Sequence, residues 1–280
     1  MNQGLKKLVR MQRVIINADD LGFNTSVNNA IEEGLKARVI TSSTIMAAGQ
    51  AVDGVCDIVQ RYPDASFGVH LCLDEVKPVS KDSYFAKYGA LDSSGVMIKG
   101  WYKGVKSSSD LIAAIYNEWQ SQIALIQSLG VKVSHIDSHH HAHNLPYLKD
   151  VLYRLSKDFG IEKVRLPLYT PPMLRCHLKG SSLIDGNFSE KKKQGKVQKI
   201  TKYIMDVLSK EKELKWMKQS FSTTDFFCHA GTFFTNLDVL KRYNTIEIMC
   251  HPGHPAYQKE TDCLYSFEKK DIQLISYNDL

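Results

Sequence analysis

The sequence lacks the features that mark several protein classes. No apolar run approaches the roughly 18–20 residues that span a bilayer. The N-terminal run MNQGLKKLVRMQRV is basic, with neither the apolar core nor the cleavage site of a secretory signal. The 6 cysteines form no CxxC pair, which argues against a structural zinc cluster or a disulfide framework. We therefore expect a cytoplasmic protein with free thiols and no membrane partner.

Composition and length indicate an ordinary globular protein. Hydrophobic residues make up 43% of the 280 residues and charged residues 24%, which excludes disorder and collagen-like repeats. The length falls in the usual range for one α/β barrel, and the sequence shows no linker and no internal repeat. We expect a single domain over residues 1–280.

The net charge of +6 comes from one stretch. Residues 189–218 hold ten lysines and four acids, so the rest of the chain is neutral. Apolar residues in the same stretch recur at helical spacing, which predicts an amphipathic helix with a solvated lysine face. Because the stretch lacks arginine and has little aromatic interleaving, we expect no nucleic-acid partner.

Short β-rich runs alternate with helical patterns along the chain. Such alternation predicts a mostly parallel sheet with helices outside, and the number of runs fits a (β/α) barrel of about seven parallel strands. The expected strands are Arg13–Asp19, Ser42–Ala47, Ser66–Leu73, Val133–Asp137, Lys163–Leu166, Asp225–His229 and Ile246–Cys250. The expected helices are Ser26–Lys36, Gln50–Arg61, Ser109–Leu129, Pro146–Phe159, the lysine-rich stretch and Leu237–Tyr243.

Two stretches interrupt the alternation, near residues 75–107 and 170–218. Both follow expected strands, and loops that follow barrel strands line the active face. We expect long loop insertions over the mouth, although both could equally be tolerated surface insertions.

Titratable side chains gather where the expected strands end. The carboxyl ends of parallel strands converge at one mouth, so these groups should meet there. They are Asp19 and Asp20 at the end of the first strand, His70 at the end of the third, the run His135–His143 into which the fourth leads, Arg165 at the end of the fifth, His229 at the end of the sixth, and His251 and His254 after the seventh.

Neutral imidazoles and a carboxylate suit a divalent metal with an open coordination position. A second carboxylate beside the metal could serve as a general base toward water. Each of these motifs could also have a purely structural role: Asp19 and Asp20 could form a turn, and His70 could be a core histidine. At least one histidine of the run from 139 to 143 is expected to be a ligand, and spacing does not settle which.

The motifs together resemble a known family. They are NADDLGFNTSVNNAI, TSSTIMA, FGVHLCL, SHIDSHHHAHNLP, VRLP and EIMCHPG, which run in order from about residue 13 to residue 254. In this order they resemble the YdjC-like carbohydrate deacetylases, the group that includes the chitooligosaccharide deacetylases. The resemblance implies a distorted (β/α) barrel similar to that of the polysaccharide deacetylases.

The resemblance also implies roles for single residues. Asp20, His70 and His139 match the metal ligands, and Asp19 matches the general base. Arg165 resembles the arginine that orients this base, and His251 is similar in placement to the general acid. One divalent metal is implied, magnesium by the resemblance, although two imidazoles suit zinc or another transition metal better.

The activity that the resemblance implies is hydrolysis of the N-acetyl group of an acetylated mono- or oligosaccharide, which releases acetate and an amino sugar. Two alternatives remain: another metal-barrel enzyme of isomerase or amidohydrolase type, and a non-catalytic protein that binds sugar or metal. Trp101 and Tyr102 could stack on a sugar or anchor their loop. By analogy with other barrels we expect a homodimer.

Overall fold

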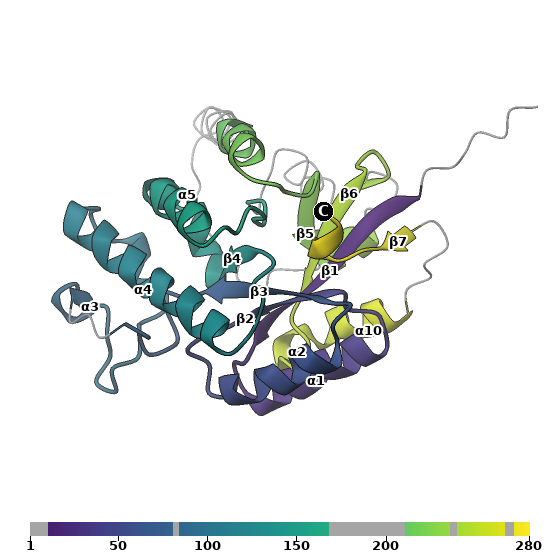
Figure 1. The fold of residues 1–280 in the computed structure, drawn as a ribbon, viewed down its shortest axis with the longest axis horizontal. Helices are drawn as coiled ribbons and strands as arrows, with labels where there is room; N and C mark the ends of the chain where they lie inside the picture. The colour runs from purple at the N-terminus through teal and green to yellow at the C-terminus, as the bar shows by residue number, and fades with distance from the viewer. Residues whose placement is uncertain (1–10, 81–83, 168–210, 236–239, 267–271) are drawn as a thin grey trace, which may run out of the picture.

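The computed structural model describes residues 11–80, 84–167, 211–235, 240–266 and 272–280. Their strands form one parallel sheet with the order β4-β3-β2-β1-β6-β5, and β7 pairs with β1 (Figure 1). The strands are β1 (Gln12–Leu21), β2 (Ser42–Ile45), β3 (Ser66–Leu71), β4 (Ile136–Ser138), β5 (Phe226–His229), β6 (Thr245–Cys250) and β7 (Ile272–Leu274).

Strand β1 forms the centre of the sheet. Its residues Val14, Ile15 and Ile16 are buried on both faces, as is usual for a strand of a covered parallel sheet. The strand pairs with β6 over residues 13–18 and with β2 over residues 17–21, so Asn17 lies opposite Met249 on one side and Ser42 on the other. This register brings the carboxyl ends of the three strands to one edge.

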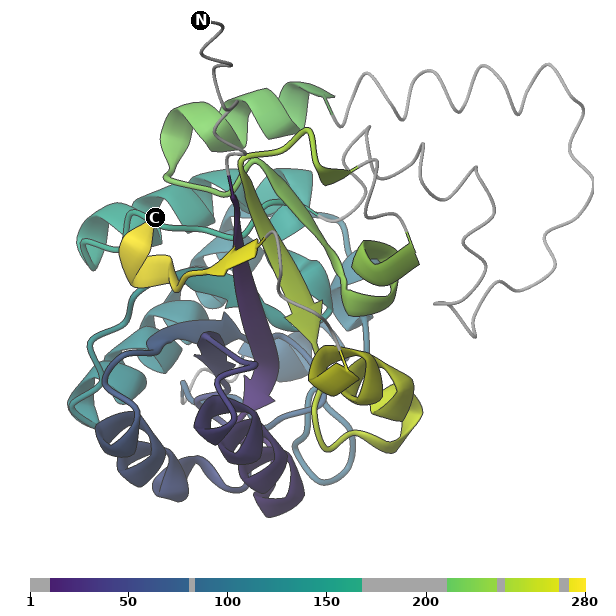
Figure 2. The same cartoon turned by 90° about the vertical axis from the view of Figure 1, so that its right-hand side faces the viewer.

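Helices cover the outside of the sheet. In Figure 1, α1 and α2 lie together along one side, and α4 and α5 lie along another. Figure 2 shows β1, in dark purple, running through the middle of the fold beside β6, in yellow-green. The helices are α1 (Thr25–Lys36), α2 (Val55–Arg61), α3 (Tyr84–Lys87), α4 (Ser109–Ser128), α5 (Lys149–Asp158), α8 (Ala230–Thr235) and α10 (Gln258–Ser266). Short 3₁₀ turns are η1 (Val52–Gly54), η2 (Trp101–Lys103), η3 (His139–Asn144), η4 (Pro146–Leu148), η5 (Pro255–Tyr257) and η6 (Tyr277–Asp279).

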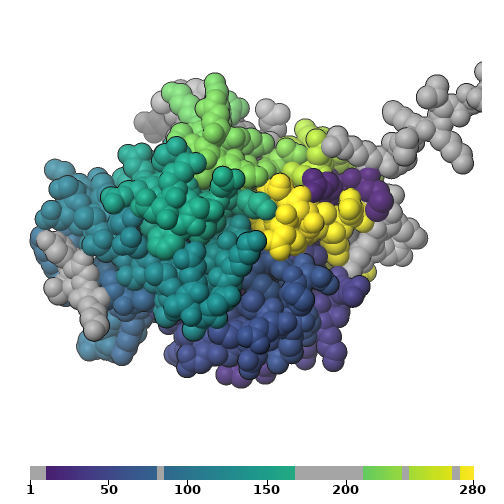
Figure 3. Space-filling model, viewed as in Figure 1, coloured from purple at the N-terminus to yellow at the C-terminus, as the bar shows by residue number. Residues whose placement is uncertain are grey.

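The longest described helix, α4, shows how the sequence specifies these elements. The Ser108 side chain accepts a hydrogen bond from the Leu111 N–H and caps the first turn. Ile115, Trp119 and Ile123 then recur at helical spacing and are fully buried against the core. The C-terminal segment, yellow in Figure 3, lies at the surface between the first described residues of the chain, in purple, and the teal part of the molecule.

The expected distorted barrel is confirmed, but one expected strand is wrong. Residues 163–166 do not form a strand. They make only two isolated parallel bridges, from Val164 to Ile136 and from Lys163 to Ser222. These bridges nevertheless continue the barrel wall beyond β4. Strand β7 was not expected, since three residues beside polar neighbours carry no periodic signal.

Parts of several expected segments lie outside the described residues. Of the lysine-rich stretch, residues 211–220 are helical, and its earlier part lies outside the described residues. Most of the insertion near 170–218 and part of the helix expected at 237–243 also lie outside them. In the insertion near 75–107, Tyr102 is fully buried, which favours an anchoring role for this residue. No helix of the described part is both long and apolar enough to cross a membrane.

Candidate active site

A cavity of about 830 Å³ opens at the carboxyl ends of the strands, and we call it the mouth. Its walls come from the segments that follow β1, β3, β4, β5 and β6, as parallel-barrel geometry requires. The aspartates, glutamate, lysines and histidines that line it are Asp19, Asp20, His70, Glu75, Lys99, Lys103, His139, His140, His141, His229, His251 and His254.

Three residues of the mouth converge on one point. Asp20 Oδ1 lies 3.2 Å from His70 Nε2 and 3.1 Å from His139 Nδ1. Zinc–ligand bonds of about 2.1 Å place neighbouring ligands of a tetrahedral or octahedral ion about 3.0–3.4 Å apart. The two distances from Asp20 therefore match those of a coordination shell, all three donor atoms lie within 4.8 Å of one another, and the group can hold a divalent ion.

Carboxylates hold the far sides of both imidazole rings. His70 Nδ1 lies 2.7 Å from Asp137 Oδ1, and His139 Nε2 lies 3.1 Å from Glu75 Oε2. Metal-binding histidines usually have such a carboxylate partner, which fixes the ring and increases its basicity. Asp137 thus leaves Nε2 of His70 as the nitrogen that faces Asp20.

Charge in this group is balanced between the rings and the carboxylates. Burial lowers the pKa of His139, but bonds to Asp20 and Glu75 outweigh it and raise the pKa to about 9. Burial also lowers the pKa of His70, but the contacts with Asp137 and Asp20 outweigh burial and raise this pKa well above its usual value. The rings therefore supply the positive charge that Asp20 requires, and a divalent cation would take the place of these protons.

The neighbouring carboxylate, Asp19, is held by a bidentate arginine. Arg165 Nη1 and Nη2 donate to its two oxygens at 2.7 Å each, and Asn17 Nδ2 donates to Oδ1 at 2.9 Å. Burial raises the pKa of Asp19, but the charge and hydrogen bonds of Arg165 outweigh it and hold the pKa well below its usual range. Asp19 is therefore ionised and fixed in orientation.

His251 follows β6, the strand next to β1, and is paired with a buried carboxylate that the sequence did not reveal. His251 Nδ1 lies 3.4 Å from Glu260 Oε2, on α10, and the Tyr257 ring stacks on the imidazole at 4.5 Å. Burial lowers the pKa of His251, but Glu260 and the aspartates of the mouth outweigh burial and raise this pKa above its usual value. This environment favours the imidazolium form.

Strained backbone is concentrated at the mouth. Among the described residues, five non-glycine residues have positive φ, and four of them are Asp20 (70°), Glu75 (60°), His140 (49°) and His141 (55°). Left-handed backbone at such residues costs free energy and is typical of functional sites, where surrounding contacts enforce it.

Of the other histidines of the run, His140 lies beside His139, with ring centroids 4.0 Å apart, and forms with it and Asp74 a second group of possible metal ligands. His140 Nδ1 lies 3.1 Å from Asp74, and His143 is buried with Nδ1 2.5 Å from the Ser138 hydroxyl. Burial lowers the pKa of His143 to about 3, so its ring is neutral. His135 does not reach the mouth: it precedes β4 and is buried at the amino end of that strand. The expectation that it joins the mouth cluster is wrong.

Comparison with known proteins gives concordant results. The sequence profile of the YdjC-like protein family matches residues 13–274. A protein of Vibrio parahaemolyticus named carbohydrate deacetylase is 28% identical over 250 residues, which cover 86% of this chain and 78% of the relative. A protein of Clostridium beijerinckii with the same name is 26% identical over 286 residues, covering 96% and 100%.

A solved structure supports the fold. A crystal structure from Enterococcus faecalis, described as that of a cellobiose-phosphate cleavage protein, superposes with a TM-score of 0.68. The match covers 96% of this chain and 98% of that one at 21% identity. At this identity the likeness establishes the architecture alone.

Proposed function

The chain belongs to the YdjC-like protein family, and from this premise we propose that it is a carbohydrate deacetylase. It would hydrolyse the N-acetyl group of an acetylated mono- or oligosaccharide and release acetate and an amino sugar. The observation that carries the proposal is the convergence of Asp20, His70 and His139 on one point beside an ionised Asp19.

Asp20, His70 and His139 would hold one divalent ion. When bound, such an ion supplies Lewis acidity, which acidifies water and polarises an amide carbonyl. Magnesium, which the family resemblance implies, prefers oxygen ligands, whereas two imidazoles suit zinc or another transition metal. We therefore propose that a transition metal binds more tightly here than magnesium.

Asp19 would act as the general base. Its carboxylate is ionised at neutral pH, and Arg165 and Asn17 hold its orientation within the mouth. It would accept a proton from the water that attacks the acetyl carbonyl carbon. Because the lowered pKa makes this carboxylate a weak base, the transfer would depend on a water whose own pKa the bound ion lowers.

His251 would act as the general acid. The bond between the amide carbon and nitrogen breaks only if the departing nitrogen is protonated, because an amide anion is a poor leaving group. The Glu260 carboxylate beside Nδ1 favours the imidazolium. With Nδ1 engaged, Nε2 is the nitrogen left to donate a proton to the amine.

Acetate release from N-acetylglucosamine and its oligomers, with and without a chelator, tests the proposal. We expect release that the chelator abolishes, and a variant Asp19→Asn that binds metal but releases no acetate. Asp150→Asn, at an exposed carboxylate on α5, is the matched control and should keep full turnover. Release unaffected by chelator, or wild-type turnover in Asp19→Asn, would contradict the proposal. The sugar identity and the homodimer stay predictions.

A further inference from the structure

Beneath the mouth lies a layer of buried polar side chains, which we call the floor network: His135, Arg165, Glu247 and Tyr277. Each of the four is 0% exposed. Arg165 Nε donates to Glu247 Oε1 at 2.7 Å, and the Tyr277 hydroxyl donates to Glu247 Oε2 at 2.5 Å. A continuous chain of hydrogen bonds thus runs from Tyr277 through Glu247 and Arg165 to Asp19.

A second route joins the same two ends. The Tyr277 ring stacks on His135 with centroids 3.6 Å apart and planes 10° from parallel. His135 Nε2 lies 3.2 Å from Asn17 Oδ1, and Asn17 Nδ2 donates to Asp19 Oδ1. Both routes therefore begin at Tyr277 and converge on the carboxylate of the general base.

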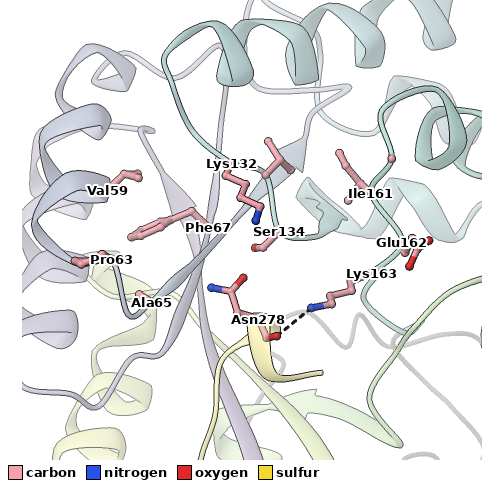
Figure 4. Close-up of a pocket in the computed structure, with 12 residues that line it drawn as sticks. Val59, Pro63, Ala65, Phe67, Lys132, Ser134, Ile161, Glu162, Lys163 and Asn278 are labelled. Atoms are coloured by element: carbon pink, nitrogen blue, oxygen red, sulfur yellow. Dashed lines mark hydrogen bonds between the residues drawn. The ribbon is translucent and has the colours of Figure 1, made fainter.

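Tyr277 is anchored at the end of the barrel opposite the mouth. Its N–H donates to Ser66 Oγ at 2.9 Å, and Lys163 Nζ donates to its carbonyl at 2.5 Å. The turn η6 is closed by a capping box between Ser276 and Asp279. Figure 4 shows Lys163 also reaching Asn278, beside a pocket at the amino ends of the strands.

The arginine at the centre of the network needs this support. The Arg165 guanidinium faces three carboxylates, those of Asp19, Asp137 and Glu247, each at 2.7 Å. Since Glu247 holds Nε, it sets the plane of the guanidinium and aims Nη1 and Nη2 at the other two. Burial raises the pKa of Glu247 to about 7, while Arg165 and the Tyr277 hydroxyl favour its ionised form. Loss of that hydroxyl would weaken the hold of Glu247 on Arg165.

We propose that Tyr277 and Glu247 are positioning residues for the general base: Tyr277 is anchored at the end of the barrel opposite the mouth, and through Glu247 it fixes the guanidinium that orients Asp19. The inference rests on the proposed function. The residues that match the family end at 274, so Tyr277 lies beyond the matched part of the chain.

The variant Tyr277→Phe tests the proposal, because it keeps the ring on His135 and removes only the hydroxyl. We expect kcat for acetate release to fall about tenfold, with KM within about twofold and metal content unchanged. The matched control is Asp279→Asn, which loosens the cap of the same segment and leaves the Tyr277 hydroxyl in place. It should lower stability without lowering kcat. Wild-type kcat in Tyr277→Phe would overturn the proposal.

A double variant separates positioning from general loosening. If Tyr277 acts through Glu247, then Tyr277→Phe combined with Glu247→Gln should be no slower than Glu247→Gln alone. Reductions in kcat that multiply would show that the two residues act independently and would overturn the proposal. Should Glu247→Gln fail to fold, the single variant Tyr277→Phe still decides.

Crystal structures of the wild type and Tyr277→Phe make the test independent of turnover. We expect the variant to lose at least one of the two Arg165–Asp19 hydrogen bonds. An unchanged bidentate pair would overturn the positioning role even if the enzyme is a deacetylase. Conversely, absence of acetate release by the wild type would contradict the proposed function, while the crystal structures would still decide the positioning role.

Discussion

The mouth and the floor network both consist of ionisable side chains, yet burial gives them different properties. At the mouth, Asp20 and His139 are 14% exposed, and their donor atoms converge on a shared point. In the floor, Arg165 and Glu247 are sealed from water and each is bonded to charged or hydroxyl partners. Polar groups that converge can bind a ligand, whereas polar groups bonded to one another stabilise the fold. Changes at the mouth should therefore affect activity, and changes in the floor should affect stability as well.

The largest effect is expected at the mouth, from His139→Ala. The variant should lose bound metal and at least about three orders of magnitude in acetate release, because Lewis acidity supplies several kcal/mol to the reaction. Elemental analysis of the purified protein measures the metal, and His141→Ala is the matched control. The ligand assignment is wrong if His141→Ala loses the metal and His139→Ala keeps it.

In the floor, Arg165→Met should cause the largest loss of stability. The change leaves Asp19, Asp137 and Glu247 buried without their common cation. We expect the free energy of unfolding to fall by about 3–5 kcal/mol, measured by urea denaturation. Arg154→Met, at an exposed ion pair with Asp158, should cost less than about 1 kcal/mol. Equal losses in the two variants would remove the contrast between floor and surface.

A smaller loss of stability is expected where the floor packs against β3. A Cβ added at Gly68 would lie 2.6 Å from the His135 ring, which is held between Tyr277 and Asn17. We expect Gly68→Ala to lower the free energy of unfolding by about 1–3 kcal/mol. Gly104→Ala has open space around the new methyl group and serves as the control. Thermal unfolding compares the two, and equal midpoints would show that His135 yields freely.

The smallest effect returns to the mouth, with Glu260→Gln. A general acid must be protonated, and the Glu260 carboxylate helps to raise the pKa of His251. The neutral amide lowers that pKa, so the protonated fraction of His251 falls at each pH. The alkaline limb of the kcat/KM profile should therefore move to lower pH, with about a three- to tenfold slower rate at neutral pH. An unmoved limb would mean that Glu260 does not act on His251.

The sequence predicted the fold and the membership of the mouth well. Strand–helix alternation places Asp19, Asp20 and His70 at carboxyl ends of strands, and in a parallel barrel such ends must meet. The positions of these residues follow from topology alone, without knowledge of side-chain packing. The site roles of the residues stay predictions until they are measured.

The sequence did not reveal the partners that lie behind the mouth. Nothing in the sequence distinguishes Glu247 from the other residues of its apolar strand, and Tyr277 follows a strand that is too short to predict. Glu260 lies on a helix with nothing unusual in its spacing. These contacts join elements distant along the chain, and their presence depends on which face of a strand or helix meets the interior. Periodicity does not carry that information.

The central claim is that Asp20, His70 and His139 hold one divalent cation. Anomalous diffraction from crystals grown with zinc or manganese tests it most directly. The account predicts one strong peak about 2.0–2.2 Å from a carboxylate oxygen of Asp20, from Nε2 of His70 and from a ring nitrogen of His139. A peak elsewhere in the mouth, or no peak that contacts all three residues, would contradict it.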